Sequence, residues 1–383
     1  MRASQRLLAA ITAAALLIPL SVASVSATPL THYVDDDGLG TNSSCAGNSA
    51  IPSSIQDAVD VAGVGDTIMV CPGTYLGTIT ASTNGLKIQS VQAKMAIIEP
   101  AADHVPDTDL VTLQNASGMQ LHGFKILVPT GGSCEYVNSL VTVSNAPNTV
   151  VAGNAIGITG TEGLGGCGYV TGISVSSASG GTKIMKNKIT DFQAIGIYFI
   201  GSGTVTINHN KINYLQAAYP SSTGGDGIFA NPTGGNALIS YNTVRSLSTG
   251  GVSTPRLNTA INVAGGGLAH VTYNTGNNAL TFIYVNGAPG GVVSHNNATL
   301  GIQDGLEFNQ STNVVVAHNN MAGTEFGVEV GSLASANSFH DNDWRGPTAT
   351  DCSDVSSGGG TGNTANTWTS NRGTGTPPQI CTP

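Results

Sequence analysis

Two glutamates of this 383-residue chain, Glu307 and Glu329, occupy equivalent places in two short segments that each begin with glycine. The segments read Gly-Leu-Glu-Phe (305–308) and Gly-Val-Glu-Val (327–330), an alternation typical of half-buried β-strands whose glutamate faces solvent. On neighbouring strands the two carboxylates would repel each other unless a cation, a shared proton or outward splaying separates them. Asp304 precedes the first segment and adds a third carboxylate. The group is a candidate for acid–base chemistry, or for binding a cation such as Ca²⁺ at Glu307 and Glu329; a solvated surface is the alternative.

The equivalent position in earlier segments carries aromatic and amide side chains. It is occupied by Tyr198, Phe229, Asn262 and Tyr284. Successive strands of a repeat stack about 4.8 Å apart, so we expect these residues and the two glutamates to form one outward stripe. Aromatic rings beside carboxylates suit a sugar chain, because the rings offer apolar contact and the charges offer acid–base or metal chemistry. The stripe therefore predicts a glycan-binding surface, whereas aromatics that only cover the sheet are the simpler interpretation.

Histidines recur at a second periodic position, directly before an asparagine. His295 and His318 lie 23 residues apart, and stacked imidazoles could bind a transition metal. Tyr241 and Tyr273 hold the same position in other copies, which favours plain ring stacking. Asp226 precedes a glycine and is interpreted first as a turn residue.

All these residues lie on an internal repeat, in which an alternating apolar segment ends in asparagine before another apolar residue. Copies occur at 150–156, 183–189, 205–212, 238–244, 271–274, 292–297 and 314–320. Short strands separated by turns once per repeat predict an all-β fold, a single parallel β-solenoid of roughly ten coils. We attribute the asparagine to a tight corner that needs the left-handed backbone conformation.

Three N-terminal segments add a family resemblance: His-Tyr-Val-Asp-Asp-Asp-Gly (32–38), Ser-Ile-Gln-Asp-Ala-Val (54–59) and Gly-Asp-Thr-Ile-Met-Val-Cys-Pro-Gly-Thr-Tyr (65–75). Together with the repeat, they resemble exported bacterial members of the right-handed parallel β-helix, or pectin-lyase-like, superfamily. The resemblance covers roughly residues 32–345 and implies the fold. It does not imply one activity, because the superfamily includes lyases, hydrolases, epimerases, adhesins and non-catalytic proteins.

Two catalytic patterns of that superfamily can be compared with this chain. Its acidic hydrolases use clustered carboxylates, which would correspond to Asp304, Glu307 and Glu329, but their Asn-Thr-Asp, Gly-His-Gly and Arg-Ile-Lys motifs are absent here. Its pectate-type lyases use Ca²⁺ with a basic residue, and Arg256, before the Asn262 segment, is the candidate base. A periplasmic copper-enzyme maturation factor also belongs to the superfamily, which keeps the histidine interpretation open.

The chain divides into three parts. Residues 1–27 have the charged start, apolar stretch and small-residue end of a signal peptide. Residues 28–345 are expected to form the β-helix, with an N-terminal cap (28–80) whose helix begins at Ile55 after Ser53 or Ser54. Residues 346–383, rich in Gly, Thr, Ser and Pro, are expected to form an irregular tail.

Composition and cysteines agree with export. The net charge of -9 excludes a general nucleic-acid binder, and no stretch after the signal peptide is long and apolar enough for a membrane span. The six cysteines predict disulfides, of which the sequence-nearest pairs are Cys45–Cys71, Cys134–Cys167 and Cys352–Cys381. We therefore expect a secreted or cell-surface protein.

Two functions remain open at this point. The first is a glycan-binding or cell-surface protein without catalysis, whose partner is a polysaccharide or envelope glycan. The alternative is a lyase or hydrolase acting on an acidic polysaccharide. The sequence does not decide between them, and it leaves the oligomeric state open.

Overall fold

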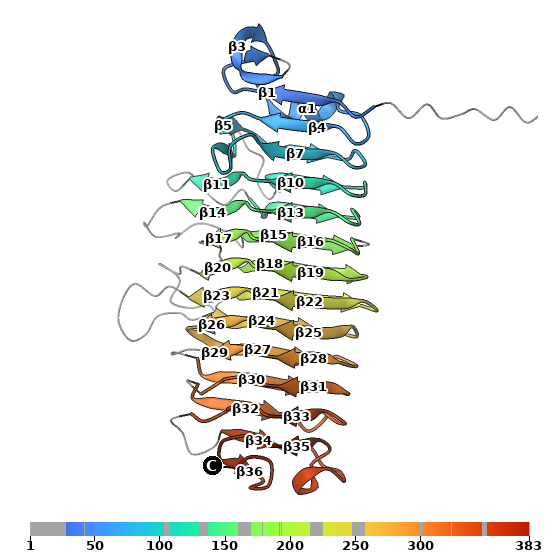
Figure 1. Ribbon diagram of the computed structural model, residues 1–383, viewed down its shortest axis with the longest axis vertical. Helices are drawn as coiled ribbons and strands as arrows, with labels where there is room; N and C mark the ends of the chain where they lie inside the picture. The colour runs from blue at the N-terminus through green and yellow to red at the C-terminus, as the bar shows by residue number, and fades with distance from the viewer. Residues whose placement is uncertain are drawn as a thin grey trace, which may run out of the picture.

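A solenoid of stacked coils makes up the molecule (Figure 1), in which the computed structural model describes residues 28–41, 43–102, 108–129, 137–159, 170–177, 179–190, 192, 194–214, 225–246, 257–298, 302–322, 324–346 and 351–382. Three long sheets of 13, nine and 12 strands, called sheets 1, 2 and 3 below, run along the stack, and their strands pair in parallel with those of the next coil. A typical coil passes from sheet 1 through sheet 2 to sheet 3. The all-β parallel β-helix expected from the repeat is confirmed, and the 13 strands of sheet 1 exceed the roughly ten coils expected.

The strand bounds follow the sheets. Sheet 1 contains β1 (Thr31–Val34), β4 (Thr67–Val70), β7 (Lys87–Ser90), β10 (Gln120–His122), β13 (Val150–Ala152), β16 (Lys183–Met185), β19 (Val205–Asn208), β22 (Asn236–Ser240), β25 (Leu268–Thr272), β28 (Gly291–Ser294), β31 (Val314–Ala317), β33 (Ser338–His340) and β35 (Thr367–Thr369). Sheet 2 contains β5 (Gly73–Leu76), β8 (Ala96–Glu99), β11 (Lys125–Pro129), β14 (Ala155–Thr159), β17 (Lys188–Thr190), β20 (Lys211–Tyr214), β23 (Thr243–Ser246), β26 (Thr275–Asn277) and β29 (Asn297–Ala298). Sheet 3 contains β6 (Ile79–Ala81), β9 (Val111–Gln114), β12 (Ser139–Ser144), β15 (Thr171–Ser177), β18 (Ile195–Ser202), β21 (Asp226–Thr233), β24 (Leu257–Ala264), β27 (Ala279–Asn286), β30 (Asp304–Asn309), β32 (Phe326–Val330), β34 (Cys352–Asp354) and β36 (Gly375–Thr376).

The core consists of columns of apolar side chains that run along the stack. Inward residues of sheet 1 pair coil after coil and are all buried: Ile68, Ile88, Leu121, Val151, Ile184, Ile207, Ile239, Val271, Val293, Val316, Phe339 and Trp368. β-Branched residues fill most of the column because they pack well on a pleated surface. Near the C-terminal end, Phe339 and Trp368 replace them and stack with ring centroids 4.1 Å apart.

At the corner between sheets 1 and 2, the asparagines do not have the left-handed conformation expected of them. The left-handed conformation belongs to the residue before each asparagine, for example Tyr241 at φ 55° and His295 at φ 56°. Asparagines such as Asn242 are instead buried. Their amides form a ladder between coils: Asn242 Nδ2 donates to Asn274 Oδ1 at 3.0 Å and to the Ile207 carbonyl at 2.9 Å. The asparagine is therefore retained for hydrogen bonding in the core, since buried backbone and amide groups must find partners.

The N-terminal end carries a short helix and a hairpin. Helix α1 (Ile55–Val61) begins after Ser54, whose hydroxyl accepts the Asp57 backbone N–H at 3.4 Å, and it packs against β1, β4 and β6. The antiparallel hairpin of β2 (Leu39–Thr41) and β3 (Ser44–Ala50) lies beside it at the end of the stack (Figure 1). The predicted Cys45–Cys71 disulfide is confirmed and joins this hairpin to the residue after β4.

At the C-terminal end, the residues expected to form an irregular tail continue the solenoid. Strands β34, β35 and β36 extend sheets 1 and 3, and a 3₁₀ turn (Thr361–Asn363) lies between the first two of them. Asparagines at 366 and 371 also accept hydrogen bonds from the preceding coil, so the ladders pass residue 345. The predicted Cys352–Cys381 disulfide is confirmed. Cys134 and Cys167 lie outside the described residues, as does the whole 1–27 segment.

Candidate functional site

The predicted stripe is one column on the outward face of sheet 3. Its residues are direct register partners on adjacent strands from β18 to β32: Tyr198, Phe229, Asn262, Tyr284, Glu307 and Glu329. Their flanking residues, for example Leu306 and Phe308 beside Glu307, are buried. The alternation in the sequence therefore predicted the register of these strands correctly, including the place of Tyr284 between Asn262 and Glu307.

The aromatic part of this stripe contains one stacked pair of rings. Tyr198 and Phe229 stack with centroids 5.4 Å apart and an interplanar angle of 17°, so each ring covers one face of the other. The opposite face of Tyr198 lies toward Ser174, its register partner on β15, whose side chain is too short to cover a ring. Tyr198, at the end of the pair, is therefore a candidate ring for apolar contact with a sugar.

The carboxylates gather at the C-terminal part of the stripe. Glu307 and Glu329 are register partners, and Asp304 begins the same strand as Glu307. Burial, followed by the charges of Glu329, Glu307 and Glu325, raises the pKa of Asp304 from 3.8 to about 6, although a hydrogen bond with Thr281 opposes the shift. Burial and the charge of Glu329 also raise the pKa of Glu307. Asp304 is therefore mostly protonated below about pH 6, well above the usual range for an aspartate.

This arrangement is looser than a preformed three-carboxylate metal site. The oxygens of Asp304, Glu307 and Glu329 do not all lie within 4.8 Å of one another. The geometry therefore fits proton transfer better than tight cation chelation, while Ca²⁺ at Glu307 and Glu329 remains an untested prediction.

Asp226 occupies a place on β21 comparable to that of Asp304 on β30, but it has a different environment. Asn262 Nδ2 donates to its carboxylate at 3.0 Å. Burial raises the pKa of Asp226, and hydrogen bonds from Asn262 and Thr259 oppose that shift. Asn262, predicted to contact a substrate, thus already holds a neighbouring carboxylate.

The described residues do not include every predicted part of the site, and two residues near Asp304 were not predicted from the sequence. Arg256 lies outside the described residues, and so do most of the long loops before β21 and β24. Glu325 and Thr281 act on Asp304 without having been predicted. Thr281 could have been found by counting back from Asp304 by one 23-residue coil; Glu325 carries no such periodic signal.

The second periodic column, at the corner between sheets 1 and 2, forms an exposed ladder of rings. Its centroid separations are 5.0 Å for His209–Tyr241, 4.9 Å for Tyr241–Tyr273, 4.6 Å for Tyr273–His295 and 5.0 Å for His295–His318. The first three pairs are stacked at 17°, 3° and 19°. Stacking therefore accounts for His209 and His295 as well as for the tyrosines.

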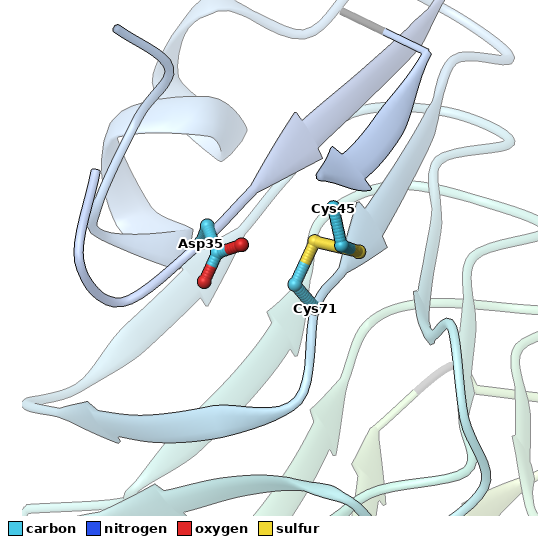
Figure 2. Close-up of side chains that lie close together, drawn as sticks. All are labelled: Asp35, Cys45 and Cys71. Carbon is cyan, nitrogen blue, oxygen red and sulfur yellow. A yellow bond between two sulfur atoms is a disulfide. The ribbon is translucent and has the colours of Figure 1, made fainter. Parts of the chain in front are cut away.

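Asp35, Cys45 and Cys71 form a further cluster of neighbouring side chains, as Figure 2 shows. The two sulfurs are bonded to each other, so neither is a thiolate that could bind a metal. Burial and the charges of Asp37 and Asp36 raise the pKa of Asp35. This cluster fastens the N-terminal hairpin and is not a metal centre.

Comparison with known proteins identifies similar folds and no similar sequences. No protein-family model matches the chain, and no curated protein matches it. Among solved structures, XylC in complex with xylose superposes with a TM-score of 0.56 at 11% identity, covering 83% of this chain and 76% of that one. The enzymatically active domain of tailspike protein 2 from bacteriophage CBA120 also gives 0.56 at 11% identity, covering 83% of this chain and 48% of that one, so this chain spans about half of it. The family 28 exopolygalacturonase of Yersinia enterocolitica gives 0.51 at 11% identity, covering 91% and 76%. These likenesses and the three parallel sheets establish that the chain has the right-handed parallel β-helix, pectin-lyase-like fold.

Proposed function

We propose that this protein binds a polysaccharide outside the cytoplasm and that the outward stripe of sheet 3 is its glycan site. The two disulfides support an oxidising compartment. Among the described residues, no helix is long and apolar enough to cross a membrane. Structures of similar fold include a xylose complex and an exopolygalacturonase, which supports a carbohydrate ligand. The single observation that carries the proposal is the continuous column from Tyr198 to Glu329.

The acidic groups of the stripe limit which charge the glycan can carry. Asp304, Glu307, Glu329 and Glu325 place several acidic groups at one end of the stripe. A polyanion would be repelled there unless a cation such as Ca²⁺ bridged it to the protein. A neutral glycan therefore fits the described residues better than the acidic polysaccharide of the lyase or hydrolase alternative.

Binding can be tested with a matched pair of tyrosine variants. Affinity electrophoresis over neutral and acidic polysaccharides, with and without Ca²⁺, identifies a ligand for the wild type. Tyr198→Ala should then weaken its binding about tenfold, because an aromatic contact of roughly 1.4 kcal/mol is lost. Tyr241→Ala removes an equally large exposed ring from the corner ladder and should leave binding unchanged. Equal effects of the two variants would locate the glycan elsewhere.

Glycoside hydrolysis is a second candidate, favoured by the Asp304 pKa of about 6. A protonated carboxyl at this position could donate its proton to a glycosidic oxygen, while Glu329 or Glu307, when ionised, activates water as a base. Release of reducing ends that Asp304→Asn abolishes, with glycan binding retained, would establish hydrolysis. Binding without any product in the wild type would leave the protein as a non-catalytic binder. The lyase alternative depends on Arg256 and gains no support from the described residues.

A further inference from the structure

The ring ladder changes character at its C-terminal end. His295 and His318 are tilted by 42°, and His318 and His340 meet at 87° with centroids 5.7 Å apart. In the next coil, the corner position is held by Asp341 instead of a ring, at φ 56°. Ring stacking explains the ladder up to His295 and does not explain His340, which lies one residue outside that column.

His340 stands in a column that carries small side chains in the four preceding coils. Its register partner on β31 is Ala317, and the preceding coils carry Ser294, Thr272 and Ser240. The imidazole therefore enters space that small neighbours leave open, beside the corner residues of its own coil and the previous one. Neither stacking nor core packing requires a ring here.

Three side chains converge at this point. Each of His318, His340 and Asp341 offers one ligand atom, and these atoms all lie within 4.8 Å of one another. His340 Nδ1 and Asp341 Oδ2 are 2.9 Å apart. With metal–ligand bonds of about 2.1 Å, two ligands at a right angle are about 3.0 Å apart and two at the tetrahedral angle about 3.4 Å apart. This pair therefore needs little movement to accept an ion.

The backbone under the cluster is held in place. His318 and Asp341 are both followed by buried ladder asparagines, and Asn319 Nδ2 donates to Asn342 Oδ1 at 2.9 Å. The side chains themselves remain open to water, with 34% of His340 and 49% of Asp341 exposed. Such a site has fixed ligands on one side and room for water ligands on the other.

We propose that His318, His340 and Asp341 bind a divalent transition-metal ion. Two imidazoles and one carboxylate suit Zn²⁺, Cu²⁺, Ni²⁺ or Co²⁺, whereas Ca²⁺ and Mg²⁺ prefer oxygen ligands. The site lies on the corner between sheets 1 and 2 and is separate from the glycan stripe of sheet 3, so it does not depend on the proposed function. A bound ion would also link the coils that contain β31 and β33.

The test uses substitutions that other coils already accept. In the untagged full chain, stripped with chelator and titrated with Zn²⁺ by calorimetry, we expect one bound equivalent and a rise in the melting temperature. His318→Tyr reproduces the corner residue of Tyr241 and Tyr273, and His340→Ser reproduces Ser294. Each should weaken Zn²⁺ binding at least about tenfold and remove the thermal shift.

His209→Tyr is the matched control, because it changes a histidine at the other end of the same ladder. It should bind Zn²⁺ like the wild type. Circular dichroism of the metal-free variants checks that each is folded. The proposal is overturned if the wild type shows no saturable binding, if His340→Ser binds as tightly as the wild type, or if His209→Tyr loses binding equally.

Discussion

Replacing Asp304 by asparagine should stabilise the protein at neutral pH. The substitution preserves the size of the side chain and removes its charge. In the folded chain, burial and the charges of Glu329, Glu307 and Glu325 raise the pKa of Asp304 from 3.8 to about 6. Ionised Asp304 is therefore unfavourable in this environment, and asparagine resembles the protonated form that the fold prefers.

The pH dependence has a definite sign. Because the folded-state pKa is the higher one, the stabilisation from protonating Asp304 is fully present below about pH 4 and is lost as the pH rises through about 6. The full difference between 3.8 and about 6 corresponds to about 3 kcal/mol. Asp304 is only partly buried, so water and salt screen its interactions, and we expect about 1 kcal/mol.

The measurement is chemical denaturation of the wild type and Asp304→Asn at about pH 4 and about pH 7.5. The variant should be more stable by about 1 kcal/mol at the higher pH, and this gain should shrink at the lower pH and in high salt. Asp60→Asn, which changes an exposed carboxylate of α1, should show no comparable pH-dependent gain. A gain for Asp304→Asn that is the same at both pH values, or a loss at the higher one, would refute the reasoning about this cluster.

Three further predictions concern the fold. Asn242→Ala removes four buried amide hydrogen bonds and should lower the free energy of unfolding by about 3–5 kcal/mol in chemical denaturation. Asn145→Gly, at an exposed amide pair, should lower it by under about 1 kcal/mol. Similar losses for the two variants would contradict the stabilising role of the asparagine ladder. Mass mapping of non-reduced peptides should recover Cys134 linked to Cys167, and any crossed pair would disprove this pairing. Ser54→Ala should lower the melting temperature slightly through loss of the α1 cap, worth about 1 kcal/mol, and an unchanged melting temperature would show that the long Ser54 hydrogen bond contributes nothing.

The fold and the stripe followed from the sequence because both depend on simple periods. Alternation within a strand sets which side chains face out, and the coil length sets which residues become neighbours. These two periods are enough to pair Glu307 with Glu329 and Asn262 with Tyr284. No side-chain chemistry had to be known to predict the register.

Other features could not be read in this way. Periodicity shows that two adjacent corner residues recur but does not tell which one adopts the left-handed conformation, so Asn242 was assigned the role that Tyr241 has. The sequence did not predict the coils after residue 345, because their strands are short and the apolar alternation is lost there. His340 was missed because it approaches His318 from a different column.

The corner column also shows where this fold tolerates change. Gly153, Lys186, His209, Tyr241, Asp341 and Ser370 all adopt the same backbone conformation at this corner, although they differ in size, charge and polarity. The asparagine beneath each one carries the structural requirement, which leaves the outer residue free to vary. The corner is thus a row of interchangeable sites at a fixed spacing of about 4.8 Å. A protein engineer could place charges, metal ligands or chromophores along it in a chosen order, with each neighbour distance set in advance by the coils.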